Sequence, residues 1–269
     1  MSSNGTGLGF IGSGRMADAI VRGLLAAGIV EAEGIVCSDP QPERLAELGR
    51  LGVGVTDDNA EVLTRADVIV LCVKPQVLGD VLAALGGQFH ERHLVVSIAA
   101  GIRTGFIEGH VGAAPVVRVM PNTPMLVGQG MSAICAGTRA DASHLDRVTG
   151  LLEPLGAVVT VDETDMDTVT AVSGSGPAYL FAFAEAMIDA GVAEGLDRDT
   201  ATTLVVQTLL GASTMLAQDP DPATLRDRVT SPGGTTMAAL NEFGRLGLEE
   251  IVAAGVRAAR IRGEELAGG

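Results

Sequence analysis

The sequence lacks the residue patterns that mark several large classes of protein. Its three cysteines, Cys37, Cys72 and Cys135, are odd in number and lie far apart. They form neither a disulfide framework nor the CxxC pairs of a structural metal site. Cys37 and Cys72 lie within apolar, strand-like runs, so we expect buried core thiols in a reduced protein.

Long apolar runs and targeting segments are lacking too. No stretch reaches the ~18 residues of a membrane span without an interrupting glycine or charge. The N-terminus leads into a strand-like run and has no signal-peptide or transit-peptide character. We therefore expect a cytoplasmic protein with no membrane partner.

Basic charge is scarce. The chain has 18 Lys and Arg against 33 Asp and Glu, which gives a net charge of −15. Nucleic acids and anionic membranes both require a basic surface, so neither is expected as a partner. Among the basic residues there is a single lysine, Lys74. The 269 residues are 47% hydrophobic, which is enough for one large domain or two modest ones with a sizeable core.

The first half of the chain alternates strand-like apolar runs with segments of helical spacing. Such alternation predicts an open parallel sheet covered by helices, a doubly wound α/β fold of the Rossmann type. The strands are expected at 7–12, 34–39, 53–56, 67–73, 93–101, 115–124, 131–137 and 157–163, and the helices at 15–28, 41–52, 58–66, 76–89, 103–112 and 141–156.

The second half has no such alternation. We place a boundary near residue 162, with a dinucleotide-binding domain at 1–162 and an all-helical substrate-binding and dimerisation domain at 163–269. Two of its helical segments are apolar on most faces, more than a domain of this size can bury alone, which predicts a two-fold dimer. Helices are expected at 165–172, 177–194, 198–217, 222–229, 234–244 and 247–267.

The segment GFIGSGRMA carries the pattern Gly12-x-Gly14-x-x-Ala17 where the first strand meets the first helix. Both the pattern and its position are typical of a dinucleotide-binding turn. Gly12 permits the tight turn, Gly14 lets the backbone approach a pyrophosphate, and Ala17 lets the helix pack on the strand. The helix N-terminus then offers free N–H groups to the phosphates. A plain tight turn is the alternative interpretation.

The end of the second strand bears on the choice of cofactor. Asp39 lies near the spacing of about 20 residues at which an acidic residue binds the ribose 2′-hydroxyl, which favours NAD(H). Ser38 and Arg44 could instead serve a 2′-phosphate, and Asp39 could simply be a turn aspartate before Pro40. On these residues the choice between NADPH and NADH stays open.

Other polar or glycine-rich segments follow later strands. Open α/β sheets bind ligands at the carboxyl ends of their strands, so we expect these segments at the cofactor crevice. Lys74 should bring its ammonium group there, and Asn122, held between two prolines, could present its amide to a nicotinamide. Each could also have a purely structural role. The segments are Asn59, Val73–Pro75, Ile98–Gly101 and Met120–Pro124.

Strong acids and bases are missing from the helical half. All four histidines, His90, His93, His110 and His144, lie in the first half. The pair at 90 and 93 has the spacing of metal ligands but no third ligand nearby, so we interpret both as surface residues and expect no metal. No HExxH, GxSxG or paired-carboxylate motif is present. Without a positioned acid, a nicotinamide enzyme fits C=N reduction better than C=O reduction, because an iminium carbon accepts hydride readily.

The segment SPGGTTMAAL begins a predicted helix with two glycines. Ser231 could cap this helix, and Pro232 suits its first position. Gly233 and Gly234 would expose N–H groups, and Thr235 and Thr236 would add hydroxyl donors. We interpret the segment as an anion cradle for a substrate carboxylate. A glycine-rich turn without a ligand is the alternative.

Six segments together resemble the Δ1-pyrroline-5-carboxylate reductase family: GFIGSGRMADAI, VKPQV, VVSIAAGI, RVMPNTP, VSGSGPAY and SPGGTT, in the family's order. The resemblance implies NAD(P)H-dependent reduction of the cyclic imine to L-proline by an interlocked homodimer, often within a ring of five dimers. It implies that the loop binds the substrate carboxylate, with Thr236 near the imine nitrogen as a proton donor. The family usually favours NADPH, although Asp39 replaces a residue that is often Ser, Thr or Arg.

The same resemblance assigns two groups of site residues. The substrate residues it implies are Ser231, Gly233, Gly234, Thr235 and Thr236, and the cofactor residues are Gly12, Ser13, Gly14, Arg15, Met16, Ala17, Ser38, Asp39, Asn59, Val73, Lys74, Pro75, Ala99, Ala100, Gly101 and Asn122.

Three other functions fit parts of the sequence. Lys74 could form a Schiff base in a lyase, and the chain could be a dinucleotide-binding scaffold without catalysis. A β-hydroxy-acid dehydrogenase would share the architecture, but such an enzyme requires a lysine in the helical domain, and this sequence has none there.

Overall fold

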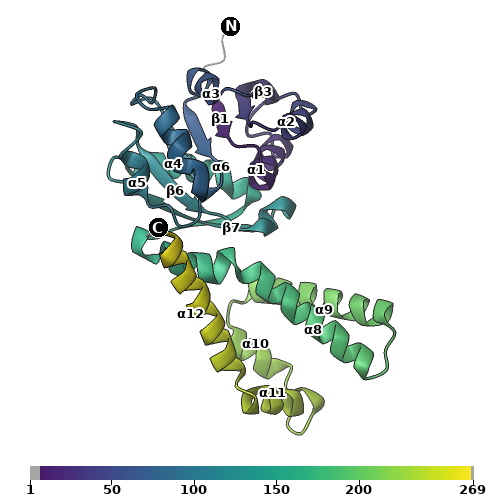
Figure 1. Ribbon diagram of the computed structural model, residues 1–269. Helices are drawn as coiled ribbons and strands as arrows, with labels where there is room; N and C mark the ends of the chain where they lie inside the picture. Colours follow the sequence, from purple (N-terminus) through teal and green to yellow (C-terminus); the bar gives the residue numbers. More distant parts are fainter. Residues whose placement is uncertain (1–6, 268–269) are drawn as a thin grey trace. The chain divides into compact units, whose positions relative to one another are not determined.

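The computed structural model describes residues 7–267, which fall into two compact units. The first comprises Met1–Ser175 together with Ala259–Gly269, and we call it the sheet unit. The second, Gly176–Ala258, is the helical unit. Figure 1 labels many of the elements of both, and each unit is described by itself.

One eight-stranded sheet forms the centre of the sheet unit, in the order β3-β2-β1-β4-β5-β6-β7-β8. Every strand expected from the sequence is present. Their bounds are β1 Leu8–Ile11, β2 Ile35–Ser38, β3 Gly54–Thr56, β4 Val68–Leu71, β5 Leu94–Ser97, β6 Val116–Met120, β7 Gly130–Ala136 and β8 Gly156–Thr160.

The expectation of a parallel sheet is correct for six strands and wrong for the last two. β7 runs antiparallel to β6, with Val117 opposite Ala136, and β8 is parallel to β7. The reason lies in the connection, because only residues 121–129 separate β6 from β7, and they contain the 3₁₀ segment η2 (Thr123–Val127) and a left-handed Gly128. A parallel crossover needs a dozen or more residues, so this short link reverses the chain.

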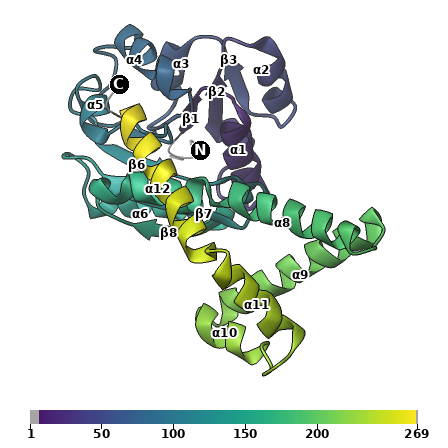
Figure 2. The ribbon, with the colours of Figure 1, turned by 60° about the horizontal axis from the view of Figure 1, so that its bottom comes forward.

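Helices cover both faces of the sheet (Figures 1 and 2). Alternate residues of a strand face opposite sides, so Phe10 belongs to one buried core and Ile11 to the other. The first core includes residues of α1, α2 and α6, and the second those of α3, α4 and α5. The bounds are α1 Arg15–Ala26, α2 Pro42–Gly49, α3 Asn59–Arg65, α4 Pro75–Ala84, α5 Thr104–Glu108 and α6 Ala142–Leu152.

The chain after β8 is helical but not regular. A 3₁₀ turn, η4 (Glu163–Asp165), leads into the short α7 (Met166–Val169). A π-helical turn, Thr170–Gly174, then replaces the end of the helix expected at 165–172. Its wide hydrogen bond joins the Ser175 N–H to the Thr170 carbonyl at 2.9 Å.

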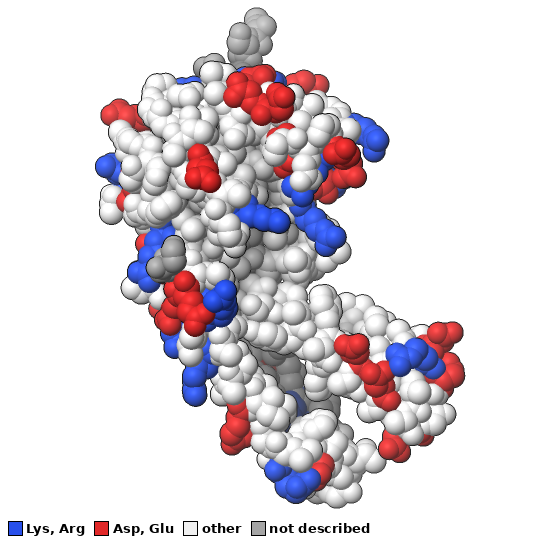
Figure 3. Space-filling view, viewed as in Figure 1, with Lys and Arg blue, Asp and Glu red and all other residues white. Residues whose placement is uncertain are grey.

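The helical unit consists of five helices that leave much apolar surface uncovered. None of the residues of α8 is fully buried, and in α9 only Ala201 and Val205 are. Phe181 is 69% exposed and Leu210 60%, and the visible flank of α8 and α9 carries little charge away from its tip (Figure 3). The bounds are α8 Gly176–Ala193, α9 Arg198–Gln218, α10 Pro222–Arg228, α11 Thr235–Arg245 and α12 Leu248–Ala267, whose last turns belong to the sheet unit.

Within the described residues, α9 is the one helix whose length and apolar composition would suffice to cross a membrane. Only 11% of its apolar window is buried within the chain. A soluble helix whose apolar surface is covered by another chain gives the same pattern, so this feature alone does not indicate a membrane.

Candidate active site

The turn after β1 requires glycine at its first position. Gly12 has φ +95°, and a Cβ added there would lie 2.9 Å from the backbone carbon and oxygen of Cys72. Its N–H donates to the Ser38 carbonyl at 2.9 Å. The turn is therefore fixed between the ends of β2 and β4, where the strand order of the sheet reverses and ligands bind in this class of fold.

The start of α1 fits a pyrophosphate. Gly14 is the N-cap residue, no side chain caps the helix, and a Cβ added at Gly14 would have no heavy atom within 4 Å. The N–H groups of the first turn, beginning at Arg15 and Met16, therefore have no capping side chain and could bind an anion. Ala17 is 0% exposed, as its expected contact with the strand requires.

Asp39 faces the glycine turn. Its Oδ2 accepts the Ser13 N–H at 2.9 Å, and its Oδ1 accepts the Gln41 N–H at 2.9 Å. Arg44 lies 3.3 Å from Oδ2. Asp39 is 4% exposed, so its carboxylate is engaged within the protein, as the turn interpretation predicts.

Ser38 and Asn59 form a pair at the ends of β2 and β3. The Ser38 hydroxyl donates to the Asn59 Oδ1 at 2.6 Å, and Ser38 is 0% exposed. The serine therefore orients the asparagine at the edge of the crevice.

The remaining expected cofactor residues follow β4, β5 and β6. Val73, Lys74 and Pro75 lead into α4, with Lys74 exposed at its N-cap position. Ala99, Ala100 and Gly101 follow β5, and Gly101 has φ +76°. The structure thus places all the expected cofactor residues at the carboxyl ends of parallel strands.

Asn122 has a role that the sequence did not reveal. Its amide nitrogen donates to the carbonyl of Ser173 at 3.2 Å and lies 3.3 Å from the Ser173 hydroxyl. Its Oδ1 accepts the Met131 N–H at 2.8 Å. The side chain thus joins the end of β6 to the π-helical turn, and its amide is already hydrogen-bonded within the sheet unit.

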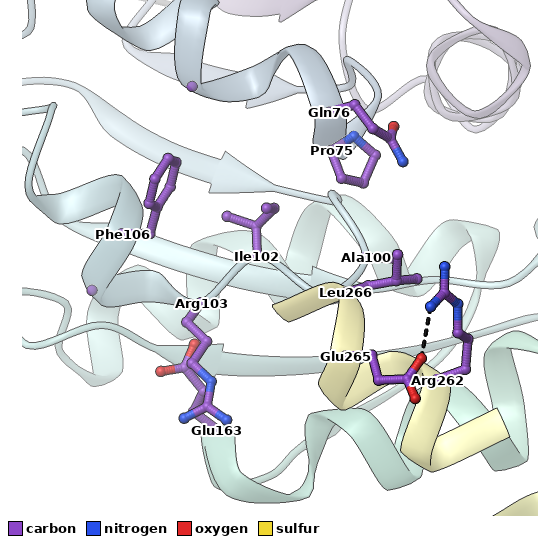
Figure 4. A pocket seen from close by; sticks show the side chains of 12 residues that line it. Pro75, Gln76, Ala100, Ile102, Arg103, Phe106, Glu163, Arg262, Glu265 and Leu266 are labelled. Atoms are coloured by element: carbon purple, nitrogen blue, oxygen red, sulfur yellow. Dashed lines mark hydrogen bonds and ion pairs between the residues drawn. The ribbon is translucent and has the colours of Figure 1, made fainter. Parts of the chain in front are cut away.

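A cavity of about 790 Å³ opens beside Pro75 and Ala100 (Figure 4). Sequence reasoning did not single out its charged residues, Arg103, Glu163 and the ion pair of Arg262 with Glu265 (2.6 Å). No motif marks them, because they come from segments distant in sequence. The other lining residues are Gln76, Gly79, Ile102, Gly105, Phe106 and Leu266.

The expected substrate loop lies in the helical unit, before α11. The expectation that Ser231 caps the helix and that Pro232 is its first residue is wrong, because Gly233 has φ +71° and the helix starts at Thr235. Gly234 is the N-cap residue, and its N–H donates to the Ser231 carbonyl at 3.0 Å. No side chain caps α11, so the N–H groups at its start, beginning with those of Thr235 and Thr236, could bind an anion.

His93 corrects another expectation, because it is buried and not a surface residue. Its Nδ1 accepts the His90 N–H at 3.0 Å, so its Nε2 donates to the Leu63 carbonyl, also at 3.0 Å. Burial and the nearby Arg92 lower the pKa of His93. Within residues 7–267, no group of three or more His, Cys, Asp or Glu side chains could hold a metal ion.

Two of the three cysteines are buried in the fold as thiols of raised pKa. Cys37 and Cys135 are buried and Cys72 is partly buried, and all three are free thiols. Burial raises the pKa of Cys37 to about 12 and that of Cys135 to about 11. Both thiols are therefore protonated at neutral pH, and the thiolate is the reactive form.

Two family models match the chain. One, described as pyrroline-5-carboxylate reductase dimerisation, matches residues 163–266. The other, described as NADP oxidoreductase coenzyme F420-dependent, matches residues 7–101. A solved prephenate dehydrogenase from A. aeolicus, with 15% identity and a TM-score of 0.57, shares the fold alone.

Curated relatives and solved structures cover nearly the whole chain. The pyrroline-5-carboxylate reductase of Pseudomonas aeruginosa is 45% identical over 97% of this chain and 96% of its own. That of Corynebacterium melassecola is 43% identical, over 97% and 98%. The structure of the Coxiella burnetii reductase has a TM-score of 0.91 at 36% identity, covering 98% of this chain and 99% of that one. The Plasmodium falciparum pyrroline carboxylate reductase, solved with NADP bound, has a TM-score of 0.88 at 32% identity, over 99% and 100%. With its glycine turn, its uncapped helix starts and this similarity over its whole length, the chain belongs to the pyrroline-5-carboxylate reductase family.

Proposed function

We propose that this protein reduces the C=N bond of 1-pyrroline-5-carboxylate to give L-proline, the last step of proline biosynthesis, with NADPH as the reductant. The observation that carries the proposal is the pair of uncapped helix starts, one at Gly14 and one at Gly234. The first suits a dinucleotide pyrophosphate and the second a small carboxylate. The relatives' names supply the reaction that joins the two ligands.

The cofactor, when bound, supplies a hydride to the imine carbon. The turn at Gly12–Ala17 holds its phosphates, and the strand-end residues from Ser38 to Asn122 border its sugars and nicotinamide. We favour NADPH over NADH, because the Asp39 carboxylate is turned toward the Ser13 N–H and paired with Arg44. An acid in this arrangement repels a 2′-phosphate less than one pointing into the crevice.

The substrate carboxylate binds at the loop before α11. Ser231, Gly233, Gly234 and Thr235 surround the uncapped helix start and supply backbone or hydroxyl donors. Thr236, which is partly buried beside them, donates a hydrogen bond to the imine nitrogen and acts as the proton donor to this nitrogen.

We also propose how the chain is divided and assembled. Residues 1–162 form the cofactor domain, and residues 163–269 form the substrate-binding and dimerisation domain. The protein acts as a homodimer in the cytoplasm, and five dimers join as a decamer. The exposed apolar surface of α8 and α9 supports the dimer.

The direct test is oxidation of NADPH by purified protein with pyrroline-5-carboxylate, followed by absorbance, with NADH in a parallel series. We expect turnover with both cofactors and a higher kcat/KM with NADPH. Oxidation of neither cofactor would refute the proposed reaction, whereas a clear preference for NADH would refute only the cofactor assignment.

The role of the loop is tested by Thr236→Ala. We expect kcat to fall more than tenfold, equivalent to at least about 1.4 kcal/mol of transition-state stabilisation. The control is Thr230→Ala, which removes a hydroxyl just outside the loop that donates to the Arg226 carbonyl at 2.6 Å. If the two variants have equal turnover, Thr236 has no part in the reaction.

A further inference from the structure

Glu163 holds the far end of the segment that follows β5, Ile98–Arg103, which we call the β5 loop. Its Oε1 accepts the Thr104 N–H at 2.6 Å, and its Oε2 accepts the Thr104 hydroxyl at 2.8 Å. Thr104 is 4% exposed and begins α5 directly after the loop. Hydrogen bonds to a carboxylate are among the stronger ones in proteins, and the burial of Thr104 partly shields these two from water.

The near end of the β5 loop is held by the sheet itself. The Ala99 N–H donates to the Ser97 hydroxyl oxygen at 3.3 Å, and the Ile98 N–H donates to the Leu71 carbonyl at 3.2 Å. Glu163 therefore supplies, from 59 residues away in sequence, the anchor that the sheet does not give to the far end.

A buried arginine supports Glu163 from within the sheet. Arg118 on β6 is 2% exposed, and its guanidinium lies 3.5 Å from Glu163 Oε1 and 3.7 Å from Asp167 Oδ1. Its NH2 group has no hydrogen-bond partner among the described residues. A buried cation needs a nearby negative charge, so Arg118 holds the carboxylates of Glu163 and Asp167 close to it.

The same cluster reaches the C-terminal helix. A Cβ added at Gly263 of α12 would lie 3.7 Å from the Asp167 side chain. Glu163 also lines the cavity beside Ala100, near Arg103 (Figure 4). The start of α5, β6, α7 and the end of α12 thus meet around the cluster of Glu163, Arg118 and Asp167 within the sheet unit.

We propose that Glu163 is a positioning residue for the nicotinamide half of the cofactor. Glu163 holds Thr104, and Thr104 in turn holds the β5 loop that precedes it. Ala99, Ala100 and Gly101 of this loop are among the expected cofactor contacts. The proposal rests on the proposed function, because it needs the nicotinamide to lie against this loop. A loop fixed at both ends loses less conformational freedom when the cofactor binds, so the cofactor binds more tightly.

Thr104→Val is the most direct variant. Removing Glu163 itself would leave Arg118 buried beside Asp167 alone and could unfold the unit. Thr104→Val, in contrast, only replaces one hydroxyl by a methyl group of similar volume. Thr104→Ser keeps the hydroxyl and serves as the rescue. The matched control is Thr138→Val, which deletes another threonine–glutamate bond of the same unit, from the Thr138 hydroxyl to Glu108 Oε1 at 2.9 Å.

The readout is equilibrium binding of two ligands, with the thermal stability of each unliganded variant measured alongside. NADPH would occupy the whole proposed crevice, whereas adenosine 2′,5′-bisphosphate, which has no nicotinamide, would occupy only the adenosine side. For Thr104→Val we expect NADPH to bind about tenfold more weakly, while the bisphosphate stays within about twofold of the wild type. Thr104→Ser and Thr138→Val should bind both ligands like the wild type.

Unchanged NADPH affinity in Thr104→Val, or an equal loss for both ligands, would overturn the positioning role and leave the proposed function intact. A wild-type protein that binds neither ligand would overturn the proposed function and the positioning role together.

Discussion

The two glycines of the β1 turn differ in the side chains that they tolerate, in line with the different roles that the sequence pattern assigns to them. Gly12 needs its positive φ, and a side chain there would meet the backbone of Cys72. Gly14 has φ −75° and open space around it. The fold therefore requires glycine at the first position, whereas nothing in the fold requires it at the second.

Two alanine substitutions separate these roles. Gly12→Ala should lower the free energy of unfolding by at least about 2 kcal/mol, from the left-handed backbone and the contact with Cys72. Gly14→Ala should change it by less than about 1 kcal/mol, yet weaken NADPH binding at least about tenfold, because its methyl group stands where the pyrophosphate approaches. Chemical denaturation of the ligand-free protein and NADPH titration measure the two quantities. Equal effects of both variants on both measurements would contradict the distinction.

The hydrogen-bond partners of individual side chains could not be predicted from the sequence. The spacing of Asp39 and Asn122 correctly predicted that each follows a strand at the crevice edge. It could not show that Asp39 is bonded to the Ser13 N–H or that Asn122 is bonded to Ser173 and Met131. Those bonds depend on partners 26, 51 and 9 residues away, which become neighbours only when the chain is folded.

At the scale of the element, apolar periodicity predicted every strand and most helices. It could not predict the direction of β7, since direction depends on the length of the link and not on the strand's own residues. Periodicity placed the start of α11 at residue 234, one residue before Thr235. The capping interpretation of Ser231 and Pro232 is wrong, because the positive φ of Gly233 keeps both residues outside the helix. Local pattern thus fixes an element's type more firmly than its ends.

His93, just before β5, makes a contribution to the free energy of unfolding that depends on pH. His93 is buried and neutral there, and its pKa is lowered first by burial and then by Arg92. The unfolded chain regains the ordinary pKa near 6.5, so it binds a proton more readily than the folded protein. The contribution is therefore fully present above about pH 6.5 and is lost as the pH falls through that value toward the folded-state pKa.

His93→Gln, which keeps a donor for the Leu63 carbonyl, should flatten this dependence. The free energy of unfolding of the wild type should fall between about pH 7.5 and 5, with this residue adding a slope of up to about 1.4 kcal/mol per pH unit. His110→Gln, at a partly exposed position two residues after the end of α5, measures what a less buried histidine contributes. Denaturant titrations at several pH values provide the comparison, and equal slopes in the wild type and His93→Gln would rule out this histidine as their source.

At the scale of the whole molecule, the helical unit is incomplete as a single chain. Phe181, Leu204 and Leu210 are each more than half exposed, whereas the sheet unit buries two cores. Apolar side chains exposed to this degree along two helices are typical of an interface between subunits. The sequence predicted the partner surface from the same helices, because no polar face interrupts their apolar residues.

A charge placed on this surface should separate the subunits. Leu210→Glu buries an unpaired carboxylate if a partner chain covers α9, so we expect a monomer where the wild type is a dimer or a larger assembly of dimers. The control Ile29→Glu changes a 45% exposed apolar residue of the sheet unit and should leave the assembly unchanged. Sedimentation velocity gives the mass, and the melting temperature of the wild type should rise with protein concentration while that of Leu210→Glu should not. If Leu210→Glu keeps the wild-type mass, α9 lies outside the interface, and its apolar surface needs a different partner.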